Sequence, residues 1–168
     1  IRGSQLFLAH IGDSRAYLMR DGELHRVTTD HSWVEEAVTQ GFLTSEEARV
    51  HPNRNVITRA IGLDPQPQID KSTMALLEGD LLLFCSDGLN SMVTDDEITR
   101  ILMDHNIEQL CEALIDTANV RGGHDNTTVI AVAIGSQSKP RGSQQETQTI
   151  AIDSKGRKSL VKRIWSRF

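Results

Sequence analysis

Three aspartates stand next to predicted strands, each within two residues of a glycine. They are Asp13 after a strand over 5–11, Asp87 after a strand over 80–86, and Asp125 just before a strand over 127–134. Strand ends are rigid, and the glycines permit close backbone approach. If these ends converge, the carboxylates form a hard-oxygen site suited to Mg²⁺ or Mn²⁺. Taken singly, each aspartate also fits ordinary turn chemistry.

The two cysteines do not fit thiol chemistry. Cys85 and Cys111 match neither a disulfide framework nor a zinc-ligand spacing, which favours a reducing compartment. A cysteine-dependent phosphatase needs Arg six positions after the nucleophile, and Ser91 and Thr117 occupy those positions. Thiol-based phosphate chemistry is therefore excluded on spacing.

Composition indicates one soluble domain with a short addition: 168 residues, 38% hydrophobic, 24% charged and 4% aromatic. Residues 1–135 hold 10 Lys and Arg against 21 Asp and Glu, a net charge of −11, whereas residues 136–168 hold 8 against 2, a net charge of +6. The acidic body argues against nucleic-acid binding and invites metal ions. No apolar run approaches the roughly 20 residues of a membrane helix.

The elements that must position the aspartates follow from periodicity and caps. Alternation and apolar runs predict strands over 5–11, 15–20, 23–27, 69–77, 80–86 and 127–134. Helices are predicted to start at Ser32, Thr44 and Thr94, each followed three residues later by Glu, and a further helix runs from about Ile107 to Arg121. Asp21-Gly22 predicts a hairpin, and the first 28 residues are interpreted as an antiparallel meander. Strand 80–86 is nearly all apolar, which predicts burial on both faces.

Five sequence blocks carry a family resemblance. In order they are His10 to Tyr17 (HIGDSRAY), Thr29 to Ser32 (TDHS), Arg59 to Gly62 (RAIG), Cys85 to Leu89 (CSDGL) and Gly123 to Thr128 (GHDNTT). Together they strongly resemble the second half of a bacterial metal-dependent (type 2C) serine/threonine protein phosphatase. The resemblance covers residues 5–134.

The resemblance implies an α+β fold: a four-layer α-β-β-α sandwich of two antiparallel sheets flanked by helices, with the amino-terminal part missing. It implies Asp87 and Asp125 as ligands of a binuclear Mn²⁺ or Mg²⁺ centre, with Asp13 in a weaker third site. The implied reaction hydrolyses phosphoserine and phosphothreonine in proteins, by in-line attack of a metal-bound water on phosphorus.

Other polar residues receive weaker assignments. The segment from 31 to about 55 matches the family's flap, in which His51 is either an acid near the substrate or a solvated loop histidine. His10 is expected in the core or on the sheet surface, and His124 in the second shell or facing solvent. Arg15 is interpreted as a structural ion-pair partner. Arg59 is left undecided between ion pairing and phosphate binding, so the phosphate-binding residue is unknown.

The family's amino-terminal blocks, Arg…Asn-Glu-Asp and Asp-Gly-Met-Gly-Gly, do not occur in this sequence, which begins at Ile1. The second block supplies the carboxylate that bridges the metals. We therefore expect the chain to be the carboxyl-terminal part of a longer phosphatase, inactive by itself. The alternative is a non-catalytic scaffold domain that binds a partner or phosphopeptide; a calcium-binding turn protein lacks any EF-hand spacing.

The predicted organisation has three parts: a partial catalytic domain over 1–135, a disordered linker over 136–156 and a basic amphipathic tail over 157–168. The tail places Leu160, Ile164 and Trp165 on one helical face and cations on the other, a pattern of membrane surfaces or partner grooves. The alternative is a frayed, solvated tail. Expected partners are phosphoproteins and a cognate serine/threonine kinase, in the cytoplasm or at the inner face of the membrane.

Overall fold

The computed structural model describes residues 1–135, 150–152 and 158–160. The strands are β1 (Gln5–His10), β2 (Arg15–Arg20), β3 (Glu23–Arg26), β4 (Asp70–Ala75), β5 (Leu81–Cys85), β6 (Val129–Ala133), β7 (Ile150–Ile152) and β8 (Lys158–Leu160). The helices are α1 (Trp33–Thr39), α2 (Ser45–Val50), α3 (Asp87–Asn90), α4 (Asp95–Asp104) and α5 (Ile107–Val120).

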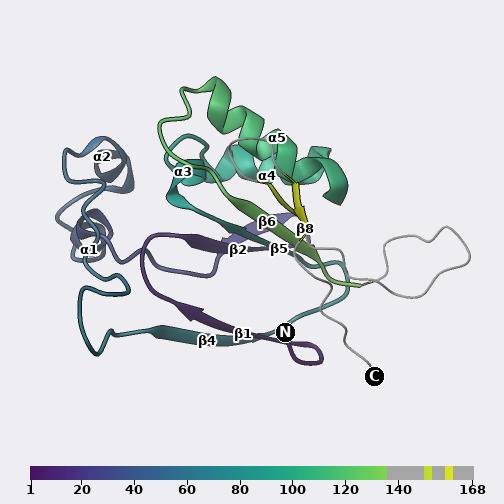
Figure 1. Ribbon diagram of the computed structural model, residues 1–168, viewed down its shortest axis with the longest axis horizontal. Coiled ribbons are helices and arrows are strands. Elements are labelled where there is room, and N and C mark those ends of the chain that lie inside the picture. The colour runs from purple at the N-terminus through teal and green to yellow at the C-terminus, as the bar shows by residue number, and fades with distance from the viewer. Residues whose placement is uncertain (136–149, 153–157, 161–168) are drawn as a thin grey trace, which may run out of the picture.

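Two antiparallel sheets lie face to face. One has the strand order β3-β2-β5-β6-β7-β8 and the other consists of β1 and β4. Figure 1 shows α3, α4 and α5 over the outer face of the larger sheet, β1 and β4 on its other side, and α1 with α2 beside the sandwich. The predicted α+β class and the two antiparallel sheets are thus confirmed. Three of the four expected layers lie in the described part of the chain.

Side-chain alternation on the central strands builds two cores. On β5, Leu82 faces β1 and β4, where it joins Leu6, Leu18 and Leu76. The next residue, Leu83, faces the helices and joins Tyr17, Leu89, Leu114 and Val129, all of them fully buried. Burying one such leucine contributes about 1.5–3 kcal/mol. The continuous apolar sequence of β5 therefore did predict a strand covered on both faces.

Local signals place most helix starts and the hairpin. Thr44 and Thr94 each form a capping box with the Glu three residues later, and the Ser32 side chain accepts from the Glu35 N–H. Asp21 and Gly22 both have positive φ, 52° and 84°, as a two-residue hairpin turn between β2 and β3 requires.

The predicted meander over the first 28 residues is wrong. β1 pairs with β4 in register from Gln5–Ala75 to His10–Asp70, whereas β2 pairs with β3 and β5 in the other sheet. Pairing with β4 lets Leu6 cover the inner face of the larger sheet, which a hairpin with β2 would prevent. The β1–β2 turn, which carries Asp13, therefore crosses from one sheet to the other at the edge of the sandwich.

Six residues near the carboxyl terminus form strands that the sequence did not predict. Ile150–Ile152 pairs with β6 and Lys158–Leu160 pairs with β7, both antiparallel, although these residues were predicted as linker and amphipathic helix. The larger sheet is thereby extended beyond β6 by β7 and then β8. The rest of 136–156 and of 157–168 lies outside the described residues, so the linker and the tail stay predictions there. Within the described part, each helix is too short or too polar to cross a bilayer.

Candidate metal centre

The turn that carries Asp13 connects β1 to β2 at one edge of the sandwich. Gly12 has φ +107°, which a residue with a side chain rarely adopts, so glycine suits this sharp crossing. The Gly12 carbonyl accepts from the His31 backbone N–H at 2.8 Å, and the Ser14 carbonyl accepts from His10 Nε2 at 2.9 Å. Asp13 thus lies half-buried between two residues whose backbone is held.

Asp87 and Asp125 lie on neighbouring loops that Ser86 joins. Ser86 Oγ donates to the Asn126 carbonyl and accepts from the Thr128 N–H, both at 3.0 Å, and the Ser86 N–H donates to the Thr128 carbonyl. Asp87 is the first residue of α3, a four-residue helix that the sequence analysis did not predict. The Asp125 carboxylate accepts from the Asn126 N–H at 2.6 Å.

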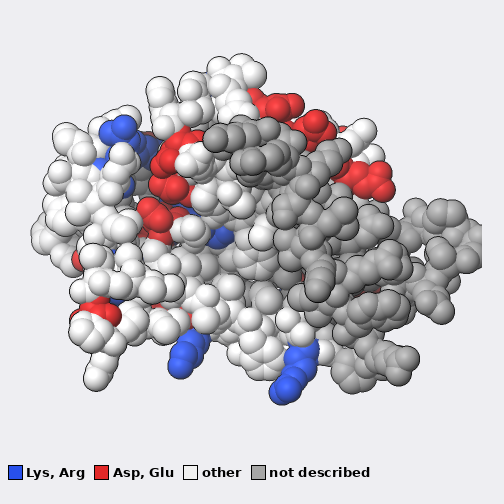
Figure 2. Space-filling view, in the orientation of Figure 1, with Lys and Arg blue, Asp and Glu red and all other residues white. Residues whose placement is uncertain are grey.

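Asp13 and Asp125 lie near enough to Asp87 for their charges to act on its carboxylate. Partial burial raises the pKa of Asp87, and the negative charges of Asp13 and Asp125 raise it further. Figure 2 shows Asp and Glu side chains gathered on this face, between the α1–α2 segment and the helices α3 to α5. Such crowding of like charges disfavours the ionised site and is relieved by a bound cation.

Arg15, two residues after Asp13, belongs to a partly buried hydrogen-bond network. Its Nε and Nη2 bind both oxygens of Asp30 at 2.7–3.0 Å, and its Nη1 donates to Tyr17 Oη at 3.2 Å. Tyr17 Oη donates in turn to Asp95 at 3.0 Å. Its predicted role as a structural ion-pair partner agrees with this geometry. Arg59, undecided from sequence, donates to Asp70 Oδ1 at 3.2 Å.

The flap prediction corresponds to α1, α2 and the segment that returns to residue 57. Its two ends are joined by the Trp33 N–H, which donates to the Val56 carbonyl at 2.9 Å, and by a bridge between Ser32 and Ile57. His51 ends α2 and stacks on Trp33, with ring centroids 4.8 Å apart. This stack holds α2 against α1. His51 Nδ1 also accepts from the Asn53 N–H at 3.1 Å.

One further histidine, His124, and both thiols have local packing environments that the structure describes. The exposed His124 ring lies over Gly122, with Nε2 at 2.9 Å from the position that a Cβ would take there. Burial raises the pKa of Cys85 to about 12 and that of Cys111 to about 11. Buried, protonated thiols are inert, which agrees with the exclusion of thiol chemistry.

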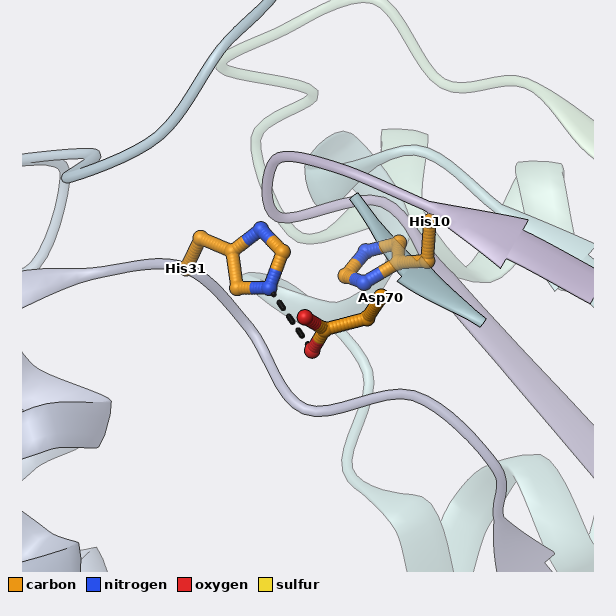
Figure 3. A group of neighbouring side chains, drawn as sticks. All are labelled: His10, His31 and Asp70. Carbon is orange, nitrogen blue, oxygen red and sulfur yellow. Dashed lines mark hydrogen bonds and ion pairs between the residues drawn. The ribbon is translucent and has the colours of Figure 1, made fainter. Parts of the chain in front are cut away.

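Sequence reasoning missed one cluster, formed by His10, His31 and Asp70. Figure 3 shows the two imidazoles and the carboxylate facing one another, and His31 Nε2 lies 3.0 Å from Asp70 Oδ2. The hydrogen bond from His31 lowers the pKa of Asp70. The available signal was the TDHS block, in which His31 follows a strand within an otherwise polar segment. Its partner Asp70 lies 39 residues further along the chain, so no local sequence pattern reveals the contact.

Comparison with known proteins decides the family. The family model described as Protein phosphatase 2C matches residues 1–127. The chain belongs to the protein phosphatase 2C family. The protein phosphatase PhpP of Streptococcus pneumoniae serotype 2 is 44% identical over 135 residues, which are 80% of this chain and 55% of PhpP. The resemblance drawn from the five sequence blocks is thereby confirmed.

Solved structures agree with this assignment. Serine/threonine phosphatase Stp1 from Staphylococcus aureus superposes with a TM-score of 0.77 at 37% identity, over 81% of this chain and 54% of Stp1. The catalytic domain of the phosphatase PstP, solved in complex with two manganese ions, gives a TM-score of 0.68 at 39% identity, over 78% of this chain and 54% of that domain. The chain thus spans about half the length of the protein phosphatase 2C relatives it matches.

Proposed function

We propose that this chain supplies one side of the active site of a metal-dependent protein phosphatase that acts on phosphoserine and phosphothreonine. The observation that supports the proposal is that the charges of Asp13 and Asp125, which come from two other turns, act on the Asp87 carboxylate and raise its pKa. Family membership supports the reaction type, because the relatives are named serine/threonine phosphatases.

The donor set fits Mn²⁺ or Mg²⁺. Carboxylate oxygens are the ligands that these hard cations prefer. In this proposal Asp87 and Asp125 hold the principal ions and Asp13 a third. When bound, such ions neutralise phosphoryl oxygens and lower the pKa of a coordinated water. The chain's own part is to hold the three carboxylates in position, through the Ser86 hydrogen bonds to residues 126 and 128 and through the Gly12 turn.

Turnover requires more than these three residues. Because the chain spans about half of its relatives, we propose that further ligands come from residues corresponding to the relatives' other half. The chain alone is then inactive. We also propose that His51 acts at the substrate entrance, since it ends α2 on the flap and stacks on Trp33.

The proposed setting is signalling in the cytoplasm, opposite a serine/threonine kinase. The two cysteines, whose spacing fits neither a disulfide framework nor a zinc site, support a reducing compartment. The basic tail over 157–168 is proposed to contact the inner face of the membrane or an apolar partner groove. Co-sedimentation with anionic vesicles, with and without residues 157–168, tests the membrane contact, and equal partitioning of the two forms contradicts it.

Phosphate release from a phosphoserine peptide tests the proposed reaction. The longer protein is expected to release phosphate only with Mn²⁺ or Mg²⁺, and the 168-residue chain is expected to release none. Equal rates for the two contradict the requirement for the other half. Tight binding of the peptide by the longer protein without any turnover contradicts the catalytic proposal and supports a scaffold domain.

A further inference from the structure

His31 is the residue at which the Asp13 turn, the flap and the smaller sheet meet. Its backbone N–H donates to the Gly12 carbonyl, and its carbonyl accepts from the Thr58 N–H at the other end of the flap, both at 2.8 Å. Its side chain is only 4% exposed and lies between Gly12 and Asp70. One residue therefore contacts three segments that are distant in sequence.

Hydrogen-bond partners fix the protonation of both imidazoles. The Gly12 N–H donates to His31 Nδ1 at 3.1 Å, so this nitrogen carries no proton. The proton of His31 is then on Nε2 and is donated to Asp70 Oδ2 at 3.0 Å. His10 Nε2 donates to the Ser14 carbonyl, so its proton is on Nε2 as well.

These proton positions argue against a metal ion bound by His10, His31 and Asp70. Because His31 Nε2 keeps its proton, it cannot coordinate a metal ion. Within this cluster, His10 Nδ1 and the Asp70 carboxylate remain as possible metal ligands, fewer than the three or four protein ligands usual for zinc. Arg59 Nη1 lies 3.2 Å from Asp70 Oδ1 and 3.3 Å from His31 Nε2, so a fixed positive charge already neutralises the carboxylate. The cluster is therefore built to orient His31.

We propose that His31, oriented by Asp70, is a positioning residue that holds the Gly12 amide and thereby fixes the Asp13 carboxylate toward the metal centre. This inference rests on the proposed function only for the identity of the metal site. Gly12 is bound by His31 at both its N–H and its carbonyl, and His10 binds the Ser14 carbonyl. The backbone is thus hydrogen-bonded to His31 on the amino-terminal side of Asp13 and to His10 on its carboxyl-terminal side.

The arrangement also couples the flap to Asp13. The residues next to His31 and Thr58 form the bridge between Ser32 and Ile57, so the two flap ends and the Asp13 turn share one set of hydrogen bonds. Removal of a residue that orients a metal ligand, without itself contacting the metal, typically lowers metal affinity by about tenfold to hundredfold. Loss of the His31 side-chain bond to Gly12 is accordingly expected to weaken the Asp13-dependent ion.

Two substitutions separate the functions of the two ring nitrogens. In His31→Asn the amide group stands near the position of Nδ1 and retains an acceptor for the Gly12 N–H, whereas in His31→Gln the amide stands near Nε2 and retains the donor to Asp70. His105→Asn, at an exposed histidine that bonds the Ile101 carbonyl, is the matched control. The readouts are amide exchange at Gly12 by NMR and titration with Mn²⁺ alone, followed by water-proton relaxation, with Asp13→Asn as the reference.

His31→Gln is expected to speed Gly12 exchange roughly tenfold and to weaken Mn²⁺ binding about tenfold. His31→Asn, which keeps the acceptor for Gly12 but loses the donor to Asp70, is expected to show a smaller change in both, and His105→Asn to stay near wild type. Wild-type exchange at Gly12 in His31→Gln overturns the positioning role, and so does equal weakening in His31→Gln and His31→Asn. Neither readout needs turnover, so an inactive protein with faster Gly12 exchange in His31→Gln contradicts only the proposed reaction. Absence of Mn²⁺ binding by wild type overturns the metal part of the inference.

Discussion

The backbone of Gly88 lies so close to Asn126 that a Cβ at residue 88 would stand 2.5 Å from the Asn126 carbonyl oxygen. Asp87 and Asp125 each adjoin one of these two residues. Their separation is therefore set by a contact between backbones that only glycine permits.

Gly88→Ala is expected to push the two loops apart. The overpacking lowers the free energy of unfolding by about 1–3 kcal/mol, which urea denaturation measures, and weakens any stabilisation by Mn²⁺. The control is Gly79→Ala, where φ is +93° but no atom lies within 4 Å of the added Cβ. The control is expected to lose stability through backbone strain while it keeps its response to Mn²⁺. An unchanged Mn²⁺ response in Gly88→Ala contradicts this account.

Removal of Arg15 tests its structural role. The Arg15 and Asp30 side chains are 16% and 8% exposed, so Arg15→Leu leaves a buried carboxylate without its main cation. We expect a loss of about 3–5 kcal/mol in the free energy of unfolding. Because the cost comes from the unpaired charge, the double variant Arg15→Leu/Asp30→Leu is expected to recover much of it. If the double variant loses as much free energy of unfolding as the two single variants together, this explanation is falsified.

The Glu97 cap is expected to make stability depend on pH. The guanidinium of Arg121 holds the pKa of Glu97 well below its ordinary value of 4.5, and the Thr94 N–H and hydroxyl lower it further. Because the folded state depresses this pKa, the stabilisation is present above pH 4.5 and is lost as the pH falls through the folded-state pKa. Glu97→Gln should therefore be less stable than wild type at pH 7.

The measurement is the urea midpoint of both proteins across the acid range. The difference between wild type and Glu97→Gln is expected to shrink as the pH falls, with Glu108→Gln on the exposed face of α5 as the control for loss of a carboxylate. A difference of the same size at pH 7 and pH 3 means that the charge of Glu97 contributes nothing.

Local chemistry made much of this fold predictable. The capping boxes at Thr44 and Thr94 lie within four residues, and the Asp21-Gly22 turn lies within two, so both could be read directly. The apolar run of β5 identified the central strand. The three aspartates could be proposed because each adjoins a strand and a glycine.

Non-local pairing explains what could not be predicted. β1 was assigned to a hairpin with β2 because they are adjacent in sequence, yet its partner β4 lies 60 residues away. The same pairing brings Asp70 to His31 and creates the cluster beside Asp13. α3 has four residues, too few for helical periodicity to register.

Asp87→Asn provides the most direct test of the central claim that the three aspartates form a divalent-cation site. Because the folded state raises the pKa of Asp87, its charge costs stability in the absence of metal, so the variant should unfold in EDTA at the wild-type temperature or above it. Millimolar Mn²⁺ is expected to raise the melting temperature of wild type and of the exposed control Asp116→Asn, and to leave Asp87→Asn unchanged. An equal Mn²⁺-induced shift in wild type and Asp87→Asn would contradict the metal centre.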